Sequence, residues 1–89
     1  MSEYLWTKTL EYEALLASAL EAAGAADGQA AAAAECLEMA EAYLDDGRHF
    51  LEGDDLANAL AAFAYGHGWL DAGVRTGVLT ADDPELFTI

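Results

Sequence analysis

The chain has 89 residues and a mass of 9.4 kDa, which leaves room for a single small domain. Its 17 acidic and 3 basic residues give a formal net charge of -14, which excludes a basic surface for direct binding of nucleic acid. A chain of low hydrophobicity and high charge would be disordered, but 55% of these residues are hydrophobic. The composition therefore predicts a folded, acidic domain.

Helical patterns fill three stretches, predicted at about residues 2–23, 29–52 and 55–75, and two breaks at residues 24–28 and 53–55 separate them. In the first stretch Leu5, Tyr12 and Leu16 lie on one apolar stripe. The second stretch opens with five consecutive alanines, which have high helix propensity. This pattern predicts an all-α, up-and-down three-helix bundle over residues 1–77, followed by a short C-terminal tail over residues 78–89.

The break between the second and third helices combines a helix end with a helix start. Gly53 suits the left-handed conformation that commonly ends a helix, and Asp54 suits the N-cap of the next one. Asp55, in the first turn, would then lie at the positive end of the helix dipole. We expect Gly53 and Asp54 to form the turn and the cap.

The third helix is apolar nearly all round, because Asn58, His67 and Asp71 are its only strongly polar residues within 56–74. Two seams run along it: Leu56, Leu60, Phe63, His67, Leu70 and Val74, and beside them Ala59, Ala62, Gly66, Trp69 and Gly73. A helix in a three-helix bundle normally keeps a polar face. The pattern therefore indicates a surface for self-association or for a protein partner, and its polar residues favour a buried helix over a membrane span.

The tail cannot continue the third helix, because Pro84 interrupts it. Two acidic residues precede this proline, and an apolar end follows, made of Leu86, Phe87, Thr88 and Ile89. Two arrangements are compatible with this pattern. We favour docking of the apolar end on its own bundle over binding in the groove of a partner.

The acidity itself has two interpretations. In molar salt the Debye length falls to about 3 Å, so repulsion between carboxylates is screened, and an acidic surface with a single lysine is typical of halophilic proteins. The alternative is an acidic mimic of nucleic acid, which is less favoured because the acidic residues are scattered along the chain. A cytoplasmic protein is expected, because the N-terminus has no signal pattern and Cys36 is the only cysteine.

Residues 43–75 resemble the archaeal family called domain of unknown function 357. The resemblance rests on an aromatic residue and an Asp before Phe50, the Gly53-Asp54 turn, Ala59, and the segment FAYGHGWLDAG at residues 63–73. It covers over a third of the chain and implies an up-and-down three-helix bundle of archaeal origin, without an established activity. Together with the acidity, it suggests a haloarchaeal member.

Five residues of the third helix are the candidate site for a ligand or a partner: Tyr65, His67, Trp69, Asp71 and Arg75. His67 and Asp71 are neighbours on one helix face, since they are four residues apart, and so are Asp71 and Arg75. An Asp between a His and an Arg could orient a titrating imidazole. The favoured interpretation is structural, with an ion pair between Asp71 and Arg75 and with His67 in a core seam.

Other chemistry finds little support in the sequence. His49 and His67 are predicted far apart, and Cys36 lacks partners at a metal-ligand spacing, so no metal, no catalytic residue and no cofactor is expected. Helical nucleotide-associated domains of the HEPN type look similar, but their ribonuclease members place a His about one helical turn after an Arg. In this chain His49 follows Arg48 directly, and no His follows Arg75.

The sequence thus favours a non-enzymatic interaction module that self-associates, or docks into a larger complex, through its third helix. The first alternative is a helical enzyme subunit, or a HEPN-like domain, that uses Tyr65, His67, Asp71 and Arg75. The second alternative is the acidic mimic.

Overall fold

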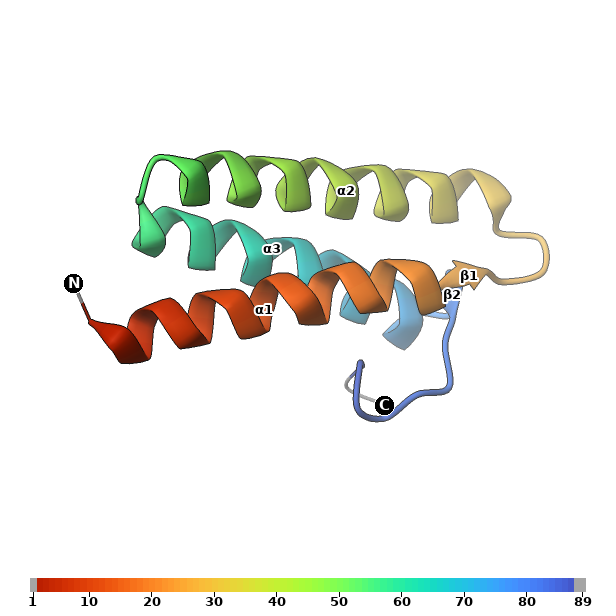
Figure 1. The fold of residues 1–89 in the computed structure, drawn as a ribbon. Coiled ribbons are helices and arrows are strands. Elements are labelled where there is room, and N and C mark those ends of the chain that lie inside the picture. Colours follow the sequence, from red (N-terminus) through yellow and green to blue (C-terminus); the bar gives the residue numbers. More distant parts are fainter. Residues whose placement is uncertain (1, 88–89) are drawn as a thin grey trace.

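The computed structural model describes residues 2–87 and confirms the all-α three-helix bundle (Figure 1). Helix α1 spans Glu3–Ala22, α2 spans Ala30–Glu52 and α3 spans Leu56–Arg75. Two short strands, β1 at Gly24–Ala25 and β2 at Leu79–Thr80, flank the bundle. The helix bounds agree with the predicted ones to within one residue at each end.

Helix α3 is the central element, since it packs against both α1 and α2, and Figure 1 shows it between them. Consecutive helices run in opposite directions, and the bundle measures 46 × 22 × 16 Å. The core is built around Phe63 and Leu70 of α3 and Leu16 of α1, each 0% exposed. Burying side chains of this size contributes about 1.5–3 kcal/mol each.

Glycine on the inner side of α3 allows the helices to approach closely. A Cβ on Gly66 would lie 2.9 Å from both Leu16 Cδ2 and Tyr43 Cβ, which is too close for either contact. Gly47 of α2 is in a similar position, because a Cβ there would overlap the ring of Phe63. These two glycines therefore set the distance between α2 and α3 in the middle of the bundle.

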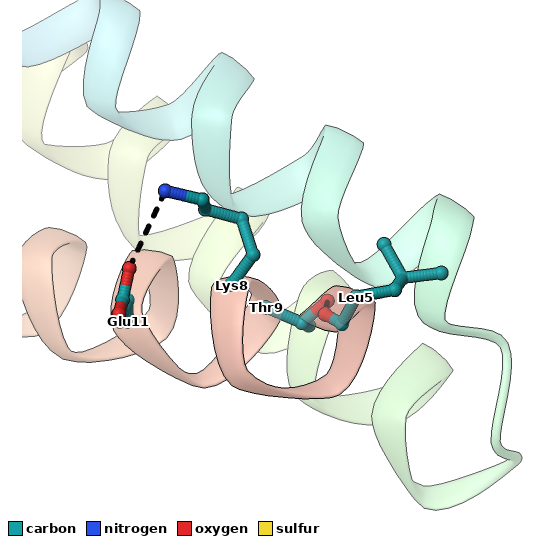
Figure 2. A network of polar contacts seen from close by, with 4 residues as sticks. All are labelled: Leu5, Lys8, Thr9 and Glu11. Atoms are coloured by element: carbon teal, nitrogen blue, oxygen red, sulfur yellow. Dashed lines mark hydrogen bonds and ion pairs between the residues drawn. The ribbon is translucent and has the colours of Figure 1, made fainter. Parts of the chain in front are cut away.

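The start of α1 supplies its own polar contacts (Figure 2). Ser2 is the N-cap, and its hydroxyl oxygen accepts a hydrogen bond from the Leu5 amide at 3.2 Å. Thr9 is fully buried, and its hydroxyl donates to the Leu5 carbonyl at 2.7 Å, so this buried polar group is satisfied. Lys8 lies on the helix surface and forms an ion pair with Glu11 at 3.5 Å.

Gly53 ends α2 as its C-cap, but the left-handed conformation and the N-cap of α3 each lie one residue later than predicted. Gly53 has φ of -90°, and it is Asp54 that adopts the left-handed conformation, with φ of 59°. Asp55 is the N-cap, since its Oδ1 accepts from the Asn58 amide at 3.3 Å while its Oδ2 accepts from Asn58 Nδ2 at 2.7 Å. Asp tolerates the left-handed region better than most residues, so the turn does not require glycine there.

The tail docks on its own bundle, which is the arrangement that we favoured. Strand β2 pairs antiparallel with β1, with Gly24 opposite Thr80 and Ala25 opposite Leu79. Beyond Pro84 the chain turns back, and Phe87 is only 4% exposed. Neither strand is predicted from the sequence. The predicted apolar residues Thr88 and Ile89 lie outside the described residues.

Within residues 2–87, no helix has the length and the apolar character that crossing a bilayer requires.

Candidate functional site

Helix α3 has an inner face and an outer face of different character. The inner face is buried in the bundle and consists of Leu56, Ala59, Ala62, Phe63, Gly66, Leu70 and Gly73. These positions come from both predicted seams, so the two seams together form one broad buried surface. The burial of this surface fixes which residues of α3 point away from the bundle.

The outer face of α3 is exposed and nearly uncharged. We call it the open face and define it as Ala61, Ala64, Tyr65, Gly68, Trp69 and Ala72. Tyr65 is 62% exposed, Trp69 is half-buried, and the other four are exposed. No residue of the open face is acidic, although the chain has 17 Asp and Glu residues. An exposed apolar surface of this kind is typical of a binding site for protein.

Two shallow hollows lie along this face and share Tyr65. The larger, of about 460 Å³, is formed by α3 alone and is lined by Ala64, Tyr65, Gly68, Trp69 and Ala72. The smaller, of about 250 Å³, lies between α2 and α3, where the rings of Tyr43 and Tyr65 are 4.7 Å apart. Phe50 and the acidic Asp46 of α2 also line this second hollow, so a carboxylate lies at the edge of the open face. Both are open to solvent, which suits a side chain of a partner better than an enclosed small molecule.

His67 and Asp71 are close together, as their spacing predicts, but they face the tail. His67 Nε2 lies 2.6 Å from the Leu86 carbonyl oxygen, and His67 Nδ1 lies 3.4 Å from Asp71 Oδ2. The imidazole also stacks on the ring of Phe87, with 6.2 Å between the ring centroids. Because a carbonyl oxygen can only accept, Nε2 must be the donor to Leu86. His67 therefore anchors the C-terminal tail to α3.

The five predicted site residues are thus divided between two sides of the helix. Tyr65 and Trp69 belong to the open face, whereas His67 holds the tail and Asp71 lies beside His67. Successive residues of a helix point about 100° apart, so positions 67 and 69 point in nearly opposite directions. Arg75 is exposed in the last turn of α3. Trp69 therefore does not form a common pocket with His67 and Asp71 in the described part of the chain.

The aromatic partners supplied by α2 were missing from the predicted site. Tyr43 and Phe50 are seven residues apart, which places them on one side of α2. That spacing is visible in the sequence, but it is equally typical of core residues. The contact between Tyr43 and Tyr65 depends on how α2 packs against α3, and the sequence does not reveal that packing.

The geometry offers no set of groups for metal binding within the described part of the chain. Residues 2–87 contain no cluster of three or more His, Cys, Asp or Glu side chains that could hold a metal ion. Cys36 is a half-buried free thiol, and a Cβ on Gly73 would lie 3.5 Å from its sulfur. The character of the candidate site therefore lies in the exposed apolar surface of the open face.

The comparisons with known proteins identify the family. The family model described as protein of unknown function (DUF357) matches residues 11–79, which is well over half of the chain, so the chain belongs to this family. No curated protein and no solved structure matches the chain.

Proposed function

We propose that this member of the DUF357 family is a non-enzymatic interaction module of a salt-rich archaeal cytoplasm, and that it binds a protein partner through the open face of α3. The observation that carries the proposal is the exposed, uncharged face in a chain of net charge -14. Aromatic residues at the centre of such a face are frequent anchors of protein interfaces, and Tyr65 and Trp69 occupy that position.

The distribution of charge supports both parts of this proposal. Acidic residues occupy exposed positions on α1, on α2 and in the tail, where they keep a protein soluble in concentrated salt. On α3 the open face interrupts this pattern over more than three helical turns. Adaptation to concentrated salt alone would favour acidic residues in this region as well.

A pair of substitutions tests the proposal by adding one charge to the open face or elsewhere. Ala64→Asp places a carboxylate in the centre of the face, whereas Ala14→Asp adds the same charge at an exposed position of α1. The measurement is capture of proteins from a lysate of the encoding organism in molar KCl. Circular dichroism checks that both variants fold.

We expect the wild-type chain and Ala14→Asp to retain the same proteins, further copies of this chain included, and Ala64→Asp to lose at least nine tenths of them. Equal capture by Ala64→Asp and Ala14→Asp would show that the open face is not the binding surface. Such a result would refute the proposed function.

A further inference from the structure

We infer that the occupant of the open face is a second copy of this chain, bound so that the two α3 helices cross antiparallel about a twofold axis near residues 66–67. This inference rests on the proposed function and names its partner. In this arrangement Tyr65 of each copy packs on Gly68 of the other. The shape of the face, the charges at its two ends and its extent favour this arrangement.

The shape of the open face is self-complementary, as a twofold interface requires, because each copy offers the same patch. Large and small residues are placed symmetrically about the axis. Tyr65 meets Gly68, and Trp69 meets Ala64, while Ala61 meets Ala72. A Cβ built on Gly68 would have no atom within 4 Å, so the space over this residue is open in the single chain.

The charges at the two ends of α3 also complement each other in an antiparallel pair. The exposed Asp54 and the N-cap Asp55 lie at the start of the helix, and Arg75 lies at its end. Lys8 and Arg48 are paired with Glu11 and Glu13, whereas Arg75 forms no ion pair within residues 2–87.

In the proposed register Arg75 lies opposite Asn58 of the second copy, about one helical turn from its Asp55. Both copies gain this pairing because of the twofold axis. A parallel pair would instead bring the two Arg75 side chains together, so charge selects the antiparallel orientation. The negative helix dipole end beside Arg75 also meets the positive end of the partner helix.

The extent of the face predicts a weak dimer with a characteristic response to salt. The open face from Ala61 to Ala72 is about 17 Å long at 1.5 Å per residue, which places the interface among those burying less than about 1,200 Å². Two chains of charge -14 repel each other in dilute salt, and molar salt screens that repulsion. Association should therefore strengthen with salt, whereas a basic partner would be released by it.

Sedimentation equilibrium of the purified chain, up to about 1 mM protein, measures this association in about 0.2 M and about 2 M KCl. We expect the association constant to rise at least tenfold between the two, with Ala14→Asp unchanged and Ala64→Asp monomeric throughout. A wild-type chain that stays monomeric under both conditions overturns the inference. So does a dimer that persists in Ala64→Asp, because it must use another surface.

Disulfide trapping tests the orientation in a Cys36→Ala background. Gly68→Cys would place the two sulfurs close to the twofold axis, about 4.5 Å apart along the helix direction, whereas Ala57→Cys would place them about 28 Å apart in that direction. We expect rapid oxidation to a covalent dimer for Gly68→Cys alone. Crosslinking of Ala57→Cys at a similar rate indicates a parallel pair and overturns the proposed register.

The two proposals fail separately. If the purified chain is monomeric while capture of a different protein is lost in Ala64→Asp, the open face binds that protein and the second copy is excluded. If capture and association are both insensitive to Ala64→Asp, the proposed function fails as well.

Discussion

The inner and outer faces of α3 are made of the same residue types but differ in burial. Phe63 and Gly66 are buried in the bundle, whereas Tyr65 and Gly68, two residues further along, are exposed. On the inner face glycine lets two helices touch within the chain. On the outer face the space over Gly68 is open, and the Tyr65 ring is 62% exposed beside the ring of Tyr43. Composition alone therefore does not distinguish a buried face from an exposed one.

The largest contrast between the faces should come from their aromatic residues. Phe63→Ala removes a ring that is 0% exposed and leaves a cavity, so we expect the free energy of unfolding to fall by about 3–5 kcal/mol. Tyr65→Ala removes a ring that is 62% exposed and should cost less than about 0.5 kcal/mol in dilute, monomeric protein. Urea unfolding of the two variants measures the difference. Similar losses would mean that Tyr65 belongs to the core.

Replacing Gly66 or Gly68 by alanine should change the free energy of unfolding less, and in opposite directions on the two faces. Gly66→Ala places a methyl group against Leu16 and Tyr43 and should destabilise the chain by about 1–3 kcal/mol. Gly68→Ala places a methyl group in open space on a helix and should raise the free energy of unfolding by about 0.5–1 kcal/mol. Thermal unfolding of the monomer resolves the two signs. A loss of stability in Gly68→Ala would show that the outer face is already covered.

The smallest effect concerns the side of α3 that faces the tail. His67→Ala removes the hydrogen bond to Leu86 and the stacking on Phe87, so we expect a loss of about 0.5–1.5 kcal/mol. Amide hydrogen exchange at residues 85–87 should accelerate, while exchange in the middle of α2 should not. Association through the open face should stay as in the wild type. A variant that keeps its tail protected but loses association would give His67 a role in binding.

The helices were predictable because the signals for them are local. The apolar stripe of α1, the alanine run of α2 and the apolar composition of α3 each act within a few residues, and the breaks between them contain Gly and Asp. Local signals do not fix the turn residue by residue: Asp54 takes the left-handed conformation expected for Gly53, and Asp55 is the N-cap expected at Asp54. Either Asp could have capped α3, and the geometry of the turn selected Asp55.

About half of the candidate site was predictable in the same sense. Tyr65 and Trp69 follow from a helix that is apolar nearly all round. Their aromatic neighbours Tyr43 and Phe50 do not, because the contact depends on the packing of α2 against α3. The opposite directions of His67 and Trp69 follow from the helical period and are predictable, whereas the docking of the tail on His67 is not, because it depends on the tertiary fold.

The sequence by itself determined that the chain folds, that it forms three helices, and that the third has too few polar residues to be an ordinary surface helix. The tertiary structure alone decided which side of α3 is covered, that the tail covers His67, and that β1 and β2 pair at one end of the bundle. The physical reason is the range of the interactions. Helix formation depends on neighbours three or four residues away, whereas burial depends on segments that are distant in the chain and meet only after it has folded.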